Sequence, residues 1–525
     1  MNNRNHNFGL KIPSLLFIGA LLILIIFTSR TPPFGDSYVY AHRITTLELT
    51  AIHCGYCILG AGFHFLLRPF GTDPVLSLNI LSILLGSLSV VCMYLFSYQL
   101  TGDPILSIVA SMLLLFNGTF WMYAEYAEVY VPQLFFVLLS ILAIVRLKPA
   151  AAALCFMAAI TITPSSVLVL PAAIYLIFLK KYNRRQILSF LLPVTAFILF
   201  LCLLDLPRAF RLMKWPIRSP VTFFDYFSYF ALFREIISRV AMVYGKSFNI
   251  MLLAAAAGFV LFFKGARRIW YLMLALILPF GVYILNIGLF SGDHMIISLI
   301  AVAFCASYGL VRIIRRLSYG KKTGYAAALS LIAVYALISH HLLIGHAAER
   351  SKELEKVVEK VSVTMKKDGV LISDFNVGTA IWYLEGEEIN QYLLTGRPQL
   401  YLRKWDGGYE DPMKGLQGKF WINRVFFPDS VMNIKGFAEL LEGRTIYVAG
   451  DIYRMPKLQA LILPGKVIER KKKDYPGVKE VGEYFERRYN ASVIYYPIVE
   501  YRYYYLYRLL IRESGTRTPC SGEKP

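Results

Sequence analysis

Long apolar runs constrain this chain more than any other feature of its sequence. The runs SLLFIGALLILIIF, FILFLCLL and IWYLMLALILPFGVYIL hold no charged residue. A helix needs about 20 apolar residues to cross a hydrocarbon layer roughly 30 Å thick. The chain has 525 residues, of which 57% are hydrophobic, more than a soluble protein of this length needs. The sequence therefore predicts a multi-pass membrane protein that is mainly α-helical.

About eleven membrane-spanning helices are expected within a transmembrane domain of residues 1–345. Their ranges share a high apolar content and are 11–29, 76–98, 104–120, 131–146, 149–162, 165–179, 186–205, 247–264, 269–289, 295–312 and 324–344. The ranges 149–162 and 165–179 are short, so a bend in place of two crossings is an open alternative.

Lysine and arginine mark one side of this expected domain. They fill four connections, near 146–148, 180–185, 264–268 and 312–322. Cytoplasmic loops of membrane proteins are enriched in Lys and Arg, so the N-terminus is expected in the cytoplasm and the segment after 345 outside it. The same rule accounts for the net charge of +21, and nucleic acid is not an expected partner. The membrane is that of a prokaryotic cell or a eukaryotic endoplasmic reticulum.

Two loops on the opposite, outer side need separate interpretation. The loop 30–75 contains CGYCILGAGFHFLL, a run too short to span, and we expect two helices lying at the membrane interface there. The loop 206–246 is basic and is expected to form an amphipathic helix on the membrane surface. Its cations at helical spacing are Arg208, Arg211, Lys214 and Arg218.

Ionisable residues from three distant segments are also expected on the outer side. They are Asp36, Glu48, His53, Glu125, Glu128, Asp293 and His294. Ionisable groups near the ends of membrane helices are functional candidates. Helix capping is the structural alternative for Asp36 and Asp293. Glu125 and Glu128 are three residues apart, so a helix would place both on one face, and stabilisation of the following span by its dipole is their structural alternative.

Three motifs in this part of the chain resemble a known family. FGDS at 34–37, IHCGYCILG at 52–60 and AEVYVPQLFF at 127–136 look like the GT-C glycosyltransferases. The nearest branch includes the vertebrate O-mannosyltransferase that acts on plexin-type receptors. Members of that branch typically carry G-D-S after the first span, then an H-P-P-G-Y-P-like stretch, then A-E-V-Y before a later span.

The resemblance implies a reaction. GT-C enzymes transfer a sugar from a polyprenyl-phosphate carrier to an acceptor on the non-cytoplasmic face. Here it implies a hexose, with mannose as one candidate, and a hydroxyl acceptor on protein Ser/Thr, a glycan or a lipid. Asp36 matches the acidic residue that serves as base, while His53, Gly55 and Tyr56 match H-x-G-Y and Glu128 matches the A-E-V-Y glutamate.

Chemistry suggests roles for the remaining polar residues. A positioned carboxylate can accept the acceptor proton, and cations can stabilise the leaving phosphate. Glu125, Asp293 and His294 are further substrate-binding candidates. The basic loop 206–246 binds either the donor phosphate or anionic headgroups in general. The scheme requires no metal, although Asp36, Glu125 and Glu128 offer oxygen ligands for a divalent cation.

The sequence departs from the family pattern at two places. Cys54 and Cys57 replace the expected prolines, and Thr163-Pro164-Ser165 stands where a T-H-H-like stretch is usual. The two thiols could form a local disulfide. A thioredoxin-like redox role is disfavoured because no βαβ context surrounds them, and a zinc site would need two more ligands.

Residues 346–525 form the second expected domain. Their composition is polar. GVLISDFNVGTAIWYL indicates a strand and then a helix, RTIYVAGDIY another strand, and LPGKVIERKKKDY and ASVIYYPIVEYRYYYLYRLLIR strand pairs, in a small α/β or α+β fold. Two other functions stay open. A transporter or lipid-linked sugar flippase would show charges at mid-membrane or paired broken helices. A membrane sensor would bind its ligand through this outer domain.

Overall fold

The computed structural model describes most of the first half of the chain and selected parts of the second. The described residues are 11–28, 32, 35–47, 53–204, 244–245, 247–287, 292–317, 321–365, 370–373, 377, 380, 383, 389–394, 402–404, 419–423, 445–451, 483, 486, 491–500 and 504–513. They divide into a helical unit, Met1–Arg30 with Tyr40–Ala347, and a sheet unit, Thr31–Val39 with Ala348–Pro525.

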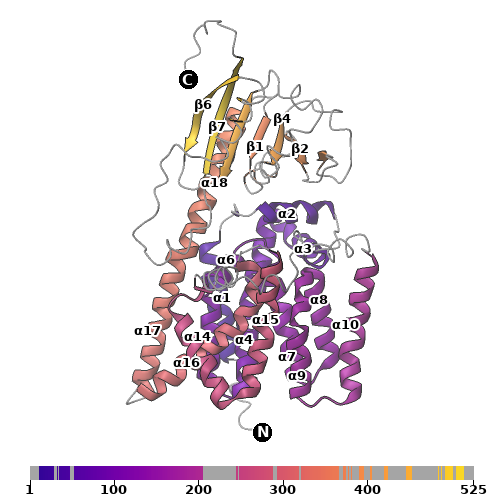
Figure 1. Cartoon of the computed structure of the whole chain (residues 1–525), viewed down its shortest axis with the longest axis vertical. Helices are drawn as coiled ribbons and strands as arrows, with labels where there is room; N and C mark the ends of the chain where they lie inside the picture. Colours follow the sequence, from indigo (N-terminus) through magenta and orange to yellow (C-terminus); the bar gives the residue numbers. More distant parts are fainter. Residues whose placement is uncertain are drawn as a thin grey trace, which may run out of the picture. The chain divides into compact units, whose positions relative to one another are not determined.

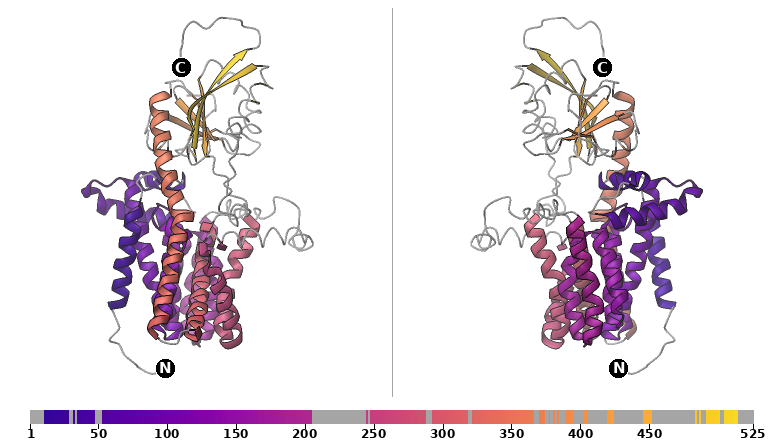
Figure 2. Two further views of the ribbon diagram at one scale, coloured as in Figure 1. Left: turned by 90° about the vertical axis from the view of Figure 1, so that its left-hand side faces the viewer. Right: turned by 90° about the vertical axis from the view of Figure 1, so that its right-hand side faces the viewer.

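The helical unit consists of apolar helices that run side by side in all views (Figures 1 and 2). The elements are α1 Lys11–Phe27, α2 Gly35–Thr46, α3 Cys54–Leu67, η2 Arg68–Phe70, α4 Pro74–Thr101, α5 Pro104–Leu115, α6 Gly118–Ala124, α7 Tyr130–Val145, α8 Pro149–Ile162, η3 Pro164–Val169, α9 Leu170–Leu179, α10 Arg184–Leu204, α14 Met251–Gly265, α15 Arg267–Ile287, η4 Gly292–Ser298, α16 Leu299–Leu317, α17 Lys321–Ser339, the π-helical η5 His340–Ile344, and α18 Gly345–Thr364. Helix α2 starts in the sheet unit, and α18 continues into it.

Several of these helices are long and apolar enough to cross a membrane, as the sequence predicts. Among the described residues they are Pro74–Thr101, Arg184–Leu201, Met295–Leu317 and Ala326–Thr364, with Pro104–Leu115 and Gly118–Ala124 as a fifth, bent candidate. Shorter apolar helices account for other predicted spans, among them Lys11–Phe27 and Tyr130–Val145.

Two predicted spans differ from the structure in shape. A straight helix over 104–120 is wrong, because α5 and α6 meet at an angle of 64°. Asn117 starts a second helix at this point, because its side chain caps α6 by accepting a hydrogen bond from the Phe120 N–H at 3.0 Å. The span expected to end at 344 instead continues as one helix through the π turn to Thr364.

Small residues bring two helices of this bundle into direct backbone contact. A Cβ on Gly258 of α14 would lie 1.8 Å from the Cys305 carbonyl oxygen, and one on Gly309 of α16 would lie 2.1 Å from the Ala254 carbonyl oxygen. Such small-xxx-small pairs allow membrane helices to pack closely where no water drives their association.

The sheet unit contains a mixed seven-stranded sheet of order β3-β2-β4-β1-β5-β7-β6. Its strands are β1 Val370–Ser373, β2 Ile389–Leu394, β3 Leu402–Lys404, β4 Lys419–Asn423, β5 Ile446–Asp451, β6 Ala491–Glu500 and β7 Tyr504–Glu513. Strands β2, β4, β1 and β5 pair in parallel, and β3, β7 and β6 pair antiparallel to their neighbours. Helix α18 ends beside β5, where the Tyr447 hydroxyl donates to the Thr364 carbonyl at 2.8 Å.

The sheet is close to what its sequence pattern predicts. The segments predicted as strands at 370–373 and 446–451 form β1 and β5, and the alternating segment after 490 forms the β6–β7 hairpin. The predicted strand LPGKVIERKKKDY lies outside the described residues. Strands β2 and β4 were not predicted, since INQYLL and KFWIN show no clear period of two.

Candidate functional site

His53 joins the start of α3 to the end of α8. Its Nδ1 donates to the Ile162 carbonyl oxygen at 2.7 Å, across 109 residues of sequence. A carbonyl oxygen only accepts, so Nδ1 carries a proton. The residue that matches the family histidine is thus held in one orientation by the backbone of α8.

Gly55 allows this close approach. A Cβ at this position would lie 2.2 Å from Thr161 Oγ1 and 3.0 Å from the Thr161 carbonyl carbon. Any larger residue must therefore push α3 away from α8. The glycine of the HCGY motif has a steric role at a helix–helix contact.

Tyr40 of α2 covers the start of α3 with its aromatic ring. Its ring packs edge-on against His53, with centroids 5.6 Å apart, and against Tyr56, with centroids 5.1 Å apart. Tyr56 is fully buried. The aromatic contacts therefore help to exclude water from Tyr56 and cover part of the half-buried His53.

Glu125 and Glu128 lie in the irregular segment 125–129 between α6 and α7, so the expectation that one helix carries both is wrong. Glu125 caps the C-terminus of α6, so the helix-dipole interpretation does not apply to it, whereas Glu128 directly precedes the N-cap Val129 of α7 and keeps that alternative. Both carboxyl groups are buried, with exposures of 1% for Glu125 and 3% for Glu128. Buried acids cost free energy unless they are paired or protonated, so their placement needs a further explanation.

The environment of Glu125 keeps it protonated at neutral pH. Burial raises the pKa of Glu125 to about 9, although the neighbouring Trp121 indole opposes the shift. Glu125 Oε1 and Trp121 Nε1 are both buried and make no hydrogen bond of normal geometry to the described protein. A protonated Glu125 can donate a hydrogen bond to a substrate oxygen.

Glu128 lies close enough to Tyr56 for its charge to affect the pKa of the Tyr56 hydroxyl. Burial, and then the negative charge of Glu128, raise the pKa of the Tyr56 hydroxyl well above its ordinary value. Ser82 of α4 is a neighbour of this hydroxyl, yet neither oxygen reaches a partner at hydrogen-bond geometry within the described chain. Tyr56 thus remains a neutral donor beside an acidic residue.

The segment after α8 joins the same region through α7. Gln133 Nε2 donates to Ser165 Oγ at 3.0 Å and to Ser166 Oγ at 2.9 Å. Thr163 Oγ1 is buried without a partner among the described groups. Gln133 was not singled out from the sequence, although a lone amide within the apolar run YVPQLFFVLL was the available signal.

These contacts assemble three distant motifs into one buried polar cluster. The contacts join Tyr56 of α3, and His53 directly before α3, to Ser82 of α4, to Glu128 and to the segment after α8. Trp121 and Glu125 form a second buried pair around the α6–α7 connection. Buried polar atoms normally find partners, and each unpaired one costs about 1–3 kcal/mol. Within the described residues, the unpaired Tyr56 and Ser82 hydroxyls beside Glu128 are the pattern of a site that a polar substrate completes.

The structure describes only some of the other predicted site residues. Asp36 is an exposed residue in the first turn of α2, four residues before Tyr40, and belongs to the sheet unit. Asp293 and His294 lie in η4, a turn that packs against α6 and α7; their side chains are outside the described structure. Glu48 and the basic residues Arg208, Arg211, Lys214 and Arg218 also lie outside the described residues.

Within the part of the chain that the structure describes, no three His, Cys, Asp or Glu side chains converge in a way that could hold a metal ion. The divalent cation that Asp36, Glu125 and Glu128 could bind through oxygen stays a prediction.

Cys54 and Cys57 are both free thiols. Cys54 Sγ lies 3.9 Å from the Thr161 carbonyl oxygen, and the Cys57 N–H closes the first turn of α3 on His53 O at 3.1 Å. Position 54 could accept proline at the helix start, but proline at 57 would remove this hydrogen bond and break the helix. The sequence-based prediction that both cysteines take the place of prolines is therefore wrong for Cys57.

We expect Cys54→Ala together with Cys57→Ala to retain the sugar transfer that the resemblance implies within about twofold, because packing and not thiol chemistry explains both positions. Transfer is measured with and without dithiothreitol. A tenfold loss in the double variant, with the folded fraction unchanged, would assign the thiols a chemical role.

Glu125→Gln is expected to keep the activity at pH 7 within about threefold, because the wild-type side chain is already neutral there. The folded protein retains this proton between pH 4.5 and about 9, where the unfolded chain releases it. Rising pH across that window therefore destabilises the wild type, and the gain in melting temperature of Glu125→Gln should grow with pH. Thermal unfolding from pH 6 to 9 measures this gain, with the exposed Glu359→Gln as control; equal slopes in all three proteins would show that Glu125 is ionised.

Comparison with known proteins shows which solved structures share this fold. No protein-family model and no curated protein sequence matches the chain. The structure of apo ArnT from Cupriavidus metallidurans superposes with a TM-score of 0.50 at 9% identity, covering 94% of this chain and 97% of ArnT. ArnT bound to undecaprenyl phosphate gives 0.49 at 9% identity with the same coverage. The archaeal oligosaccharyltransferase AglB from Archaeoglobus fulgidus, in complex with an inhibitory peptide and a dolichol-phosphate, gives 0.48 at 11% identity, covering 84% and 69%.

The chain thus resembles ArnT in its fold. This agrees with the fold class that the GDS, HxGY and AEVY motifs predict.

Proposed function

We propose that the protein is a membrane glycosyltransferase that transfers a hexose from a polyprenyl-phosphate carrier to a hydroxyl acceptor on the non-cytoplasmic face. One observation carries this proposal: the HxGY, AEVY and TPS segments, which the sequence resemblance singled out separately, meet in one buried region where, among the described residues, the Tyr56 and Ser82 hydroxyls have no hydrogen-bond partner. The fold shared with ArnT supports it.

In the proposed reaction, Asp36 accepts the proton of the acceptor hydroxyl as general base. The acceptor oxygen forms a bond to the anomeric carbon, the bond from that carbon to the phosphate oxygen breaks, and the electron pair leaves with the polyprenyl phosphate. The protonated Glu125, the Tyr56 hydroxyl and His53 hold the sugar hydroxyls. Glu128 orients Tyr56 and binds sugar or acceptor.

We further propose that Asp293, His294 and the basic residues of loop 206–246 bind the leaving phosphate. Mannose is the proposed sugar and a protein serine or threonine the proposed acceptor, since the motifs are nearest the O-mannosyltransferase branch. The reaction as written needs no metal, and transfer that survives EDTA treatment would support that form.

A second candidate, a lipid-linked sugar flippase, is favoured by one observation. Helix α5–α6 is broken by 64° directly before the buried acids of segment 125–129, as discontinuous helices are in transporters.

Detergent solution separates the two functions, because a flippase needs two leaflets and a transferase does not. Purified protein is incubated in detergent with a polyprenyl-phosphate mannose and a solubilised membrane-protein acceptor fraction. Release of polyprenyl phosphate with labelling of the acceptor is the expected result. Absence of turnover in detergent, with translocation of the same lipid in proteoliposomes, would establish the flippase.

A further inference from the structure

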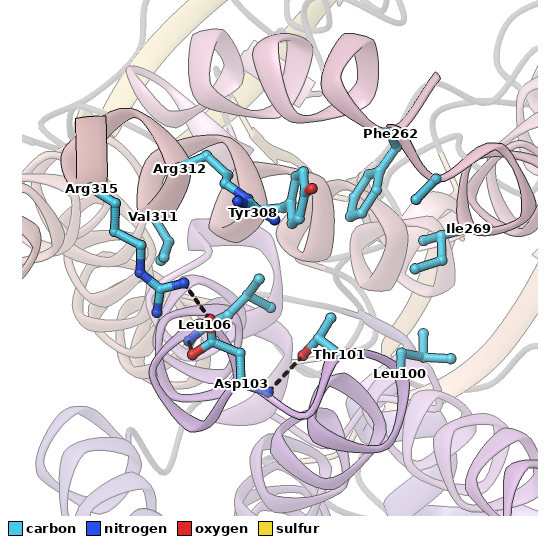
Figure 3. Close-up of a pocket in the computed structure, with 11 residues that line it drawn as sticks. Leu100, Thr101, Asp103, Leu106, Phe262, Ile269, Tyr308, Val311, Arg312 and Arg315 are labelled. Carbon is cyan, nitrogen blue, oxygen red and sulfur yellow. Dashed lines mark hydrogen bonds and ion pairs between the residues drawn. The ribbon is translucent and has the colours of Figure 1, made fainter. Parts of the chain in front are cut away.

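A pocket of about 190 Å³ lies at the end of the helical unit where α4, α14 and α16 end and α5 and α15 begin. Figure 3 shows its polar side, formed by Thr101 and Asp103 of the α4–α5 connection and by Tyr308, Arg312 and Arg315 of α16. None of these residues belongs to the polar cluster described above, and the proposed transfer reaction uses none of them.

The single acid in this pocket is already engaged. Asp103 Oδ2 accepts from Arg315 Nη1 at 2.7 Å. Its Oδ1 caps α5 by accepting from the Ile105 and Leu106 N–H groups at 3.1 and 3.3 Å. Asp103 therefore fixes the position of Arg315 while its own charge is balanced.

Arg312 supplies a second cation with a fixed orientation. Its guanidinium lies over the Tyr308 ring at 5.2 Å, and that ring stacks on Phe262 with centroids 4.0 Å apart. Within the described residues Arg312 has no carboxylate partner. A guanidinium stacked on an aromatic face keeps its edge N–H groups directed outward, the geometry that binds a phosphate through two hydrogen bonds.

The remainder of the pocket is apolar. Leu100, Ile269 and Val311 line it beside Phe262. An apolar lining beside two oriented cations suits a molecule with a phosphate at one end and hydrocarbon at the other.

The depth of the pocket agrees with such a ligand. The apolar stretches of α4, α14 and α16 stop at Thr101, Gly265 and the arginines that follow Val311. In a bilayer, these positions lie at the level of the lipid headgroups. Basic pockets between membrane helices at this level recognise anionic headgroups.

We infer that this pocket binds the phosphate of an anionic membrane phospholipid, with Arg312 and Arg315 holding the phosphate and the apolar lining of the pocket receiving the start of an acyl chain. Free phosphate shares the headgroup chemistry but makes no use of the apolar lining.

The test measures lipid binding to purified full-length protein by native mass spectrometry and by thermal unfolding in mixed micelles. Phosphatidylglycerol is the probe, phosphatidylcholine the zwitterionic comparison, and inorganic phosphate the soluble one. Arg312→Gln is the main variant because it breaks no ion pair among the described residues. Arg316→Gln is the matched control: it removes an exposed cation from the same helix end but does not line the pocket.

We expect Arg312→Gln to weaken phosphatidylglycerol binding at least tenfold and to abolish the rise in melting temperature caused by that lipid. Arg316→Gln should change neither by more than twofold. Equal losses in the two variants would overturn the inference, because they would indicate general attraction to basic charge. Displacement of the lipid by millimolar phosphate would also overturn it and would assign the pocket to a soluble phosphate.

Discussion

Asp36→Asn is expected to lower the rate of sugar transfer by about 10²–10⁴-fold, the contribution of a positioned general base. The change removes one proton acceptor and keeps the size of the side chain. Asn also suits the start of a helix, so the first turn of α2, in which Asp36 lies, should persist. Transfer from a polyprenyl-phosphate sugar in isolated membranes, normalised to protein level, measures the loss.

Asp36→Glu serves as the companion variant, because it restores the carboxylate at a displaced position. It should recover part of the activity that Asp36→Asn loses. If Asp36→Asn retained full activity, Asp36 would not be the base, and helix capping would account for its presence.

Gly55→Ala is expected to reduce transfer by about 10²-fold, the cost of roughly 1 Å of misplacement in a catalytic site. The new methyl group would meet Thr161 Oγ1 at 2.2 Å and the Thr161 carbonyl carbon at 3.0 Å. Helix α3 must then shift, and the hydrogen bond between His53 and the Ile162 carbonyl lengthens or breaks.

Gly62→Ala is the matched control in the same helix, because a Cβ there meets nothing within 4 Å. Alanine inside a helix is more favourable than glycine by roughly 0.5–1 kcal/mol, so this variant should be slightly more stable and fully active. Equal activity in both variants would show that the contact between α3 and α8 does not position the reacting groups.

The sequence predicted the helical elements well because apolar runs and capping residues are local signals. Asp73 and Asp103 cap α4 and α5 immediately before proline, as their sequences indicate. The break between α5 and α6 was missed, although Asn117-Gly118 is a recognisable capping pair in the middle of the predicted span.

The candidate site could be predicted only as a set of motifs. The bond from His53 to Ile162 and the bonds from Gln133 to Ser165 and Ser166 join segments far apart in sequence. The burial of Glu125 depends on how the surrounding helices pack, and no local pattern encodes it. The protonated state of Glu125 follows from that burial, so it too required the structure.

Analysis of glycans and lipid-linked sugars in cells that lack the gene tests the central claim most directly. We expect one hexose-bearing product to disappear and its polyprenyl-phosphate donor to accumulate. The wild-type gene should restore the product and the Asp36→Asn gene should not, although both proteins reach the membrane in equal amounts. An unchanged glycan profile in the deletion cells would contradict a role in sugar transfer.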